Sequence, residues 1–235
     1  MTSPSSPRLK VLLADDHVVL RQGLREILQQ EGFQVVGEAP DGHTAIKMCT
    51  ILQPEIAILD IGMPLLNGIE AAREIRKSSP NTKIILLTMY AEELCVLAAL
   101  RAGITGYVLK NNAFSNLTRA IDAVSRGETY LSPAVAGTVV NAYLSGATPP
   151  PADPLSDRER QVLQLIAEGS NMKEIGATLG ISGKTADTHR SRIMHKLRII
   201  STAGLVRYAL KHGLIIEPSP NPADTQGFQV SIKEG

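Results

Sequence analysis

The chain is poor in aromatic residues and cysteines and has no long apolar run, and each shortage excludes a class of protein. Aromatic residues make up 3% of its 235 residues and tryptophan is absent, so its cores must be aliphatic. Two cysteines, Cys49 and Cys95, predict neither a disulfide framework nor a zinc site, and both are interpreted as small buried residues. No apolar run approaches the ~20 residues that cross a bilayer. Residues 1–7 lack an apolar signal core, so we expect a cytoplasmic protein with no membrane partner.

The net charge of +1 hides an asymmetry between the two parts of the chain. Residues 8–131 hold 13 Lys and Arg against 14 Asp and Glu, which gives a net charge of −1. Residues 155–216 hold 10 Lys and Arg against 5 Asp and Glu, which gives a net charge of +5. A basic second part favours contact with a polyanion there, although an ordinary surface can also carry this charge.

Short apolar runs alternate with segments of helical periodicity over residues 8–128, a pattern typical of a parallel α/β sheet. In such a sheet the ligand site lies beyond the carboxyl ends of the strands, where residues from several strands meet. Polar residues at the strand ends are therefore the candidates for a functional site. The expected helices cover about 17–31, 41–53, 68–78, 92–102 and 114–126.

Polar side chains stand at the ends of four of these runs, at Asp15-Asp16, Asp60, Thr88 and Lys110. Three carboxylates at one edge repel one another unless a cation joins them, and Mg²⁺ prefers oxygen ligands. A carboxylate can also act as a nucleophile and form an aspartyl phosphate. A hydroxyl and an ammonium group then neutralise the transferring phosphoryl group. The set as a whole favours phosphoryl transfer over four unrelated strand ends.

The order of these residues resembles the receiver domain of two-component response regulators. The resemblance covers residues 8–128 and includes the stretches Asp60–Gly68 and Tyr107–Lys110. It implies a flavodoxin-like, doubly wound parallel sheet of five strands in the order 2-1-3-4-5. It also implies Mg²⁺ as the cofactor and a sensor histidine kinase as the partner that supplies the phosphoryl group.

The resemblance assigns a role to each of these side chains. Asp60 is the implied phosphoacceptor, and Lys110 pairs with the phosphoryl group. Thr88 and Tyr107 match the switch pair, in which the hydroxyl moves toward the phosphoryl group and the tyrosine rotates inward. The implied Mg²⁺ ligands are Asp15, mainly through water, with Asp16, Asp60 and the backbone carbonyl of Gly62.

Residues 155–216 predict a small all-α domain of four short helices. Ser156 with Glu159 and Asn171 with Glu174 have the spacing of helix N-caps, and two short helices joined by a tight turn predict a helix-turn-helix. Composition alone leaves a small helical interaction domain as an alternative. Before it, residues 129–154 are expected to form a linker with a short helix and a Pro-rich spacer, and residues 217–235 a disordered tail.

The second domain is similar to the LuxR-type output domain, in the stretches Leu155–Leu163, Lys173–Ile175 and Ile181–Leu197. The whole chain therefore resembles response regulators of the NarL/FixJ class. In that class the unphosphorylated receiver commonly blocks the recognition helix. Activation is expected to pair two output domains through residues 205–210, giving a homodimer that binds double-stranded promoter DNA, with RNA polymerase as a further partner.

The resemblance places nine residues of this domain near DNA. An acid such as Asp187 can accept a hydrogen bond from cytosine N4, or it can orient Arg190, and both interpretations stay open. His189 is expected to be packed and not to bind a metal ion. The implied DNA-contacting residues are Lys173, Lys184, Thr185, Asp187, Thr188, Arg190, Ser191, Arg192 and Lys196.

Other functions fit the residues less well. A phosphohydrolase with an aspartate nucleophile usually carries a second acid two residues later, where this chain has Gly62. We therefore expect no enzyme, beyond slow self-phosphorylation and self-dephosphorylation. A receiver fold that works without phosphorylation would not need the complete set of strand-end residues, and a LuxR-type sensor of small ligands would need an apolar cavity in the first half.

Overall fold

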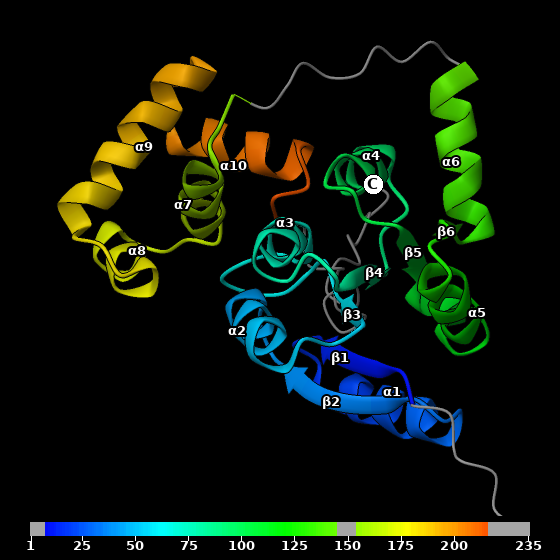
Figure 1. Cartoon of the computed structure of the whole chain (residues 1–235). Coiled ribbons are helices and arrows are strands. Elements are labelled where there is room, and N and C mark those ends of the chain that lie inside the picture. The colour runs from blue at the N-terminus through cyan, green and yellow to red at the C-terminus, as the bar shows by residue number, and fades with distance from the viewer. Residues whose placement is uncertain (1–7, 145–153, 216–235) are drawn as a thin grey trace, which may run out of the picture.

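The computed structural model describes residues 8–144 and 154–215, which form two domains (Figure 1). The N-terminal domain is a parallel sheet between two layers of helices, and the C-terminal domain is a cluster of four helices. The predicted spacer over 145–153 and the predicted tail over 217–235 lie outside the described residues. None of the helices in the described ranges is long and apolar enough to cross a membrane.

The sheet has the strand order β2-β1-β3-β4-β5-β6, with every neighbouring pair parallel. The predicted order of five strands is confirmed, and a sixth strand pairs Tyr130 and Leu131 with β5 at the edge. A strand of two residues is too short to show a strand periodicity, so this strand could not be predicted from its pattern. The strands are β1 (Lys10–Ala14), β2 (Gln34–Ala39), β3 (Ile56–Leu59), β4 (Lys83–Thr88), β5 (Gly106–Leu109) and β6 (Tyr130–Leu131).

Two aliphatic cores cover the two faces of this sheet. One core joins the sheet to α1 and α5, through residues such as Leu24 and Ile121. The other joins it to α2, α3 and α4, through residues such as Ile75 and Val96. The strands are buried on both faces, which is why they read as continuous apolar runs. The helices are α1 (Val18–Gln30), α2 (Gly42–Leu52), α3 (Gly68–Ser78), α4 (Glu93–Arg101) and α5 (Ala113–Ser125).

The segment after α5 continues the N-terminal domain. Helix α6 (Pro133–Leu144) packs beside α4, where Thr138 Oγ1 donates a hydrogen bond to the carbonyl of Ala91. Val135 of this helix is fully buried in the core on that face of the sheet. Ser132, between β6 and α6, accepts from the N–H of Leu109 and donates to the carbonyl of Tyr107. The N-terminal domain therefore extends beyond α5 through β6, beside β5, to the end of α6.

The C-terminal domain consists of α7 (Asp157–Ala167), α8 (Met172–Leu179), α9 (Gly183–Leu197) and α10 (Thr202–Lys211). The predicted caps are present: Ser156 with Glu159 and Asn171 with Glu174 both form capping boxes. Gly180 ends α8 with φ of 66°, a left-handed conformation that favours glycine at a helix end. The tight turn between α8 and α9 confirms the predicted helix-turn-helix.

Candidate functional site

The acidic residues predicted to meet at the sheet edge do meet there. Ala14 and Leu59 are paired in neighbouring strands, so Asp15 and Asp60, which follow them, emerge side by side. Their side chains are buried, with 3% and 5% of each residue exposed. Oxygens of these two residues and of Asp16 lie with His17 Nδ1 in a group whose atoms are all within 4.8 Å of one another.

Lys110 neutralises part of this charge. Its Nζ atom lies 2.9 Å from Asp60 Oδ2 and 2.7 Å from Asp15 Oδ2. Burial raises the pKa of Asp60, and the Asp15 carboxylate adds to this, while Lys110 opposes it. Burial lowers the pKa of Lys110, but the two carboxylates outweigh it and raise that pKa above its ordinary value. One ammonium group therefore faces more than one carboxylate, and the cluster of Asp15, Asp16, Asp60 and Lys110 keeps a negative charge.

The donor set fits a hard divalent cation. Asp16 Oδ1 is a buried oxygen that accepts no hydrogen bond from any described residue, and His17 Nδ1 lies 2.9 Å from it. Carboxylate oxygens with surplus negative charge are the ligands that Mg²⁺ prefers. The backbone N–H of Gly62 donates to the Asp60 carboxylate. Sequence reasoning missed His17, whose position directly after the two aspartates was the available signal.

The loop after Asp60 returns close to it. A Cβ atom at Gly68 would lie 2.1 Å from the carbonyl oxygen of Asp60, so this position requires glycine. The N–H of Gly68 donates to the carbonyl of Ile61, and Asn67 caps α3 by accepting from the N–H of Glu70. The loop that follows Asp60 is therefore fixed at its end by the start of α3.

Both residues of the predicted switch pair contact Tyr90, in the loop between β4 and α4. Thr88 Oγ1 accepts from the N–H of Tyr90 at 3.3 Å, and the hydroxyl of Tyr107 donates to the carbonyl of Tyr90 at 2.8 Å. Tyr107 is 1% exposed, and burial raises the pKa of its hydroxyl. Its side chain is already inside, so the inward rotation expected from the resemblance is not available to this conformation.

The C-terminal domain closes one side of the cavity in front of Asp60. The cavity has a volume of about 660 Å³, and its lining includes Gln164, Glu168 and Leu214 from that domain. The N–H of Asn67 donates to Gln164 Oε1 at 3.0 Å, and Asn67 Nδ2 donates to the carbonyl of Leu214 at 2.9 Å. The N–H of Leu65 donates to Glu168. No sequence pattern pointed to this arrangement, because its hydrogen bonds join residues from 97 to 147 positions apart in different domains.

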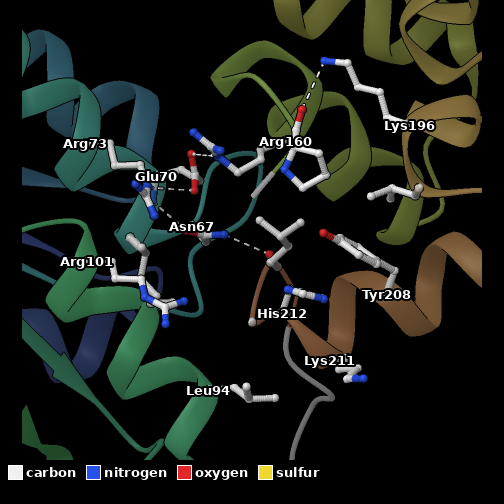
Figure 2. A pocket seen from close by; sticks show the side chains of 16 residues that line it. Asn67, Glu70, Arg73, Leu94, Arg101, Arg160, Lys196, Tyr208, Lys211 and His212 are labelled. Atoms are coloured by element: carbon white, nitrogen blue, oxygen red, sulfur yellow. Dashed lines mark hydrogen bonds and ion pairs between the residues drawn. The ribbon is translucent and has the colours of Figure 1, made fainter. Parts of the chain in front are cut away.

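An ion pair crosses the same interface. Glu70 Oε2 lies 2.9 Å from Arg160 Nε, and both side chains are buried (Figure 2). Burial raises the pKa of Glu70, while Arg160 opposes the shift. A second pair joins Lys77 to Asp157 and is exposed to solvent. The ion pairs between the domains thus lie on α3 and α7, beside the hydrogen bonds of Leu65 and Asn67.

The recognition helix expected in the C-terminal domain is α9, and it faces away from the sheet (Figure 1). Its predicted groove-facing residues are exposed, as is Arg192. In this structure the N-terminal domain therefore does not cover the predicted groove-facing side chains, and the hydrogen bonds and ion pairs between the domains reach α7 and the segment after α10. The exposed groove-facing residues are Lys184, Asp187, Thr188 and Ser191.

Several of the predicted DNA-contacting side chains have partners within the domain. Asp187 Oδ1 lies 3.6 Å from Arg190 Nη1, which favours the interpretation that this acid orients Arg190. Thr188 Oγ1 donates to the carbonyl of Lys184, and Thr185 shares a hydrogen bond with the capping Ser182. These contacts leave the exposed face of α9 ordered.

Of two further basic residues of the predicted set, Lys196 lies apart from this face and Lys173 lies beside the start of α9. Lys196 Nζ is 2.6 Å from Glu159 Oε2 and 3.2 Å from the carbonyl of Pro154, and the residue lines a cavity between the domains. Lys173 is exposed on α8, and its backbone N–H donates to the capping Asn171. The structure therefore brings most of the predicted set to one surface and leaves Lys196 outside it.

The predicted pairing surface over 205–210 needs a correction. Leu205 and Ala209 are fully buried in the core of their own domain, so they are not available to a partner. Arg207 is exposed on the same helix, and Val206 and Leu210 are partly exposed. Periodicity could not separate these faces, because a short helix in a small domain can bury either apolar stripe.

Comparison with protein families gives one match for each domain. Residues 11–122 match the response regulator receiver domain, and residues 153–209 match the luxR family of bacterial regulatory proteins. The chain is 40% identical over 215 residues to the oxygen regulatory protein NreC of Staphylococcus carnosus, covering 88% of this chain and 99% of that protein. It is 36% identical over 210 residues to the transcriptional regulatory protein MctR of Rhizobium johnstonii, covering 89% and 96%.

A solved structure extends this likeness to the fold of both domains. It is that of RcsB from Salmonella enterica serovar Typhimurium, bound to the promoter rprA in the presence of the phosphomimetic BeF3-. The TM-score is 0.57 at 31% sequence identity, over 86% of this chain and 98% of that one. The likeness therefore spans both domains of each protein.

Proposed function

Because the chain belongs to the two-component response regulators with a LuxR-type DNA-binding output domain, we propose that phosphorylation of Asp60 controls its binding to promoter DNA. The chain is a transcription regulator and not a classical enzyme. The observation that carries the proposal is the position of Asp60 at the end of β3, beside Asp15 and within 2.9 Å of Lys110.

The proposed reaction moves a phosphoryl group from a phosphohistidine of a sensor kinase to Asp60. An oxygen of the Asp60 carboxylate attacks phosphorus, the P–N bond breaks, and the imidazole leaves with a proton in place of the phosphoryl group. Lys110 supplies the positive charge that pairs with the new phosphoryl oxygens, and the Thr88 hydroxyl offers them a hydrogen bond. Mg²⁺, when bound by Asp15, Asp16, Asp60 and the carbonyl of Gly62, would supply further positive charge.

The proposed output is binding of α9 in the major groove of promoter DNA by a homodimer. The exposed residues of α9 support this, with Lys184 and Thr188 toward the bases and Arg192 toward phosphates. RcsB has been solved bound to DNA, and two of its dimers have been solved on two parallel DNAs. RNA polymerase in the cytoplasm is the proposed further partner, reached once the dimer occupies a promoter.

The test of the acceptor is intact-mass analysis after incubation with acetyl phosphate and Mg²⁺. The native chain is expected to gain one phosphoryl group and Asp60→Ala none. Asp187→Ala removes an exposed aspartate of the other domain and is expected to gain the group as the native chain does. A gain by Asp60→Ala would move the acceptor to another residue.

If no variant gains a phosphoryl group, the same assay with a sensor kinase as donor decides the matter. No gain from either donor would contradict the proposal and favour a receiver fold that works without phosphorylation.

A further inference from the structure

A second cavity, of about 900 Å³, lies between the two domains and has a basic lining (Figure 2). Helices α3 and α4 form one wall, and α7, α9 and α10 form the other. Glu70 is the acid among the residues described as lining it. The lysines and arginines of the lining are Arg73, Arg101, Arg160, Lys196 and Lys211.

Part of this positive charge is already neutralised. Arg160 pairs with Glu70, and Lys196 pairs with Glu159. Arg101 and Lys211 differ from them, because no carboxylate of the described residues lies within ion-pair distance of either. They end α4 and α10, one in each domain, so the cavity has unneutralised charge on both walls.

Arg73 adds positive charge to the first wall. Its Nε atom is 3.3 Å from Glu70 Oε1 but is buried and makes no hydrogen bond of proper geometry with any described residue. Glu70 is already paired with Arg160, and one carboxylate cannot fully satisfy two guanidinium groups. Arg73 and Arg160 share the single Glu70 carboxylate, so this wall keeps a positive charge beside the two unneutralised cations.

The rest of the lining is apolar and includes a flat aromatic surface. Ile69, Leu94 and Ala98 line the first-domain wall. On the other wall the rings of Tyr208 and His212 are stacked, with centroids 3.9 Å apart and planes at 19°. Such a site suits a molecule with charged groups at one end and a planar body, and its volume lies within the range of small-molecule sites.

We propose that this cavity binds a small phosphate-bearing polyanion of the nucleoside polyphosphate class. Its phosphates would lie between Arg73, Arg101 and Lys211, where guanidinium groups can bind phosphate oxygens with two parallel hydrogen bonds. Its ring would lie against Tyr208. The ligand touches both domains, so it binds the docked arrangement preferentially and stabilises it by linkage.

The test is isothermal titration calorimetry of the unphosphorylated full chain with ATP, inorganic pyrophosphate and adenosine. EDTA keeps divalent cations off the acidic residues around Asp60, so binding there does not contribute. ATP is expected to bind at one site per chain, more tightly than pyrophosphate, and adenosine is expected not to bind measurably. Arg101→Ala and Lys211→Ala are each expected to weaken ATP binding about tenfold, the usual size for a charged hydrogen bond.

Two exposed arginines outside the cavity give matched controls. Arg119→Ala on α5 and Arg192→Ala on α9 are expected to leave the affinity for ATP unchanged. Loss of binding in Arg192→Ala with retention in Arg101→Ala would place the anion on the DNA-binding helix and overturn the proposal. Equal affinities for ATP and pyrophosphate would overturn the nucleotide class and leave a site for inorganic polyanions.

The calorimetry is interpreted alongside thermal unfolding of each variant. Arg101 and Lys211 are both exposed, so their substitution is expected to leave the unfolding temperature unchanged. The absence of heat for ATP with a natively folded chain would overturn the proposal outright.

Discussion

Two cavities of opposite charge lie side by side between the domains, and Asn67 and Leu214 line both of them. The acidic cavity takes its charged groups from strand ends within one domain, and Asp15, Asp60 and Lys110 hold one another in place. The basic cavity is assembled from helix ends of two domains. The cluster of Asp15, Asp60 and Lys110 can form in the isolated receiver, although the second domain closes one side of its cavity, whereas the basic cavity exists only while the domains are docked.

The largest expected effect is separation of the two domains, which would remove the basic cavity and leave the acidic residues around Asp60 in place. Arg160→Ala removes the partner that Glu70 has across the interface and leaves its buried carboxylate with Arg73 alone, which costs up to about 3 kcal/mol, so we expect the domains to separate. Small-angle X-ray scattering should show a larger radius of gyration. Lys77→Ala, which removes an exposed ion pair worth less than about 1 kcal/mol, is the control and should leave the scattering unchanged.

A double variant shows whether the domains separate in Arg160→Ala because a buried charge is left behind or because packing is lost. Glu70→Gln with Arg160→Gln removes both charges together, so no buried charge is left alone, and it should recover much of the compact form. Scattering from Arg160→Ala identical to that of the native chain would show that this ion pair does not hold the domains together.

The acidic cavity is tested separately by its response to Mg²⁺. At a concentration one hundred times the dissociation constant, Mg²⁺ should raise the free energy of unfolding by about 2.7 kcal/mol. Asp60→Asn removes one carboxylate ligand and should lose most of this increase. Urea unfolding with and without Mg²⁺ measures both values, and an equal gain in the two proteins would place the cation elsewhere.

Without Mg²⁺ we expect Asp60→Asn to be more stable than the native chain, by an amount that depends on pH. The pKa of Asp60 is raised above 3.8 in the folded chain, so folding binds a proton more tightly there. The native chain should therefore lose stability as pH rises from about 3.8 through the raised pKa, whereas Asp60→Asn should not show this loss. The advantage of Asp60→Asn should thus be complete above that pKa and vanish at low pH.

The smallest expected effect concerns the loop between the two cavities. Leu65 has a φ of 68°, a left-handed conformation that is unfavourable for leucine, and its N–H donates to Glu168. Leu65→Gly should relieve this strain and stabilise the chain by up to about 1 kcal/mol, measured by thermal unfolding. Gln53→Gly, at a φ of 43° on the C-cap of α2, is the matched control and should give a similar gain. A loss of stability in Leu65→Gly alone would show that the leucine side chain is needed for docking.

The sequence was sufficient for the acidic cavity because its parts are local. A strand end delivers Asp60 or Lys110 whatever the other domain does, and parallel strands bring such ends together. The contact between Glu70 and Arg160 could not be predicted in this way, since nothing in the two helices specifies which face of one meets the other. The burial of Leu205 was missed for the same reason: it depends on how α10 is rotated against α7, and periodicity does not fix that rotation.

The attachment of α6 to the sheet edge determines how far the second domain can travel. Ser132 holds the start of this helix to β5, so the tether between the domains begins at Leu144 and ends at Pro154. Ten peptide links reach at most about 35 Å. If phosphorylation releases the output domain, as proposed, that domain stays at an effective concentration in the millimolar range near its own receiver. Recapture after loss of the phosphoryl group is then intramolecular, and its rate should not depend on how much of the protein the cell contains.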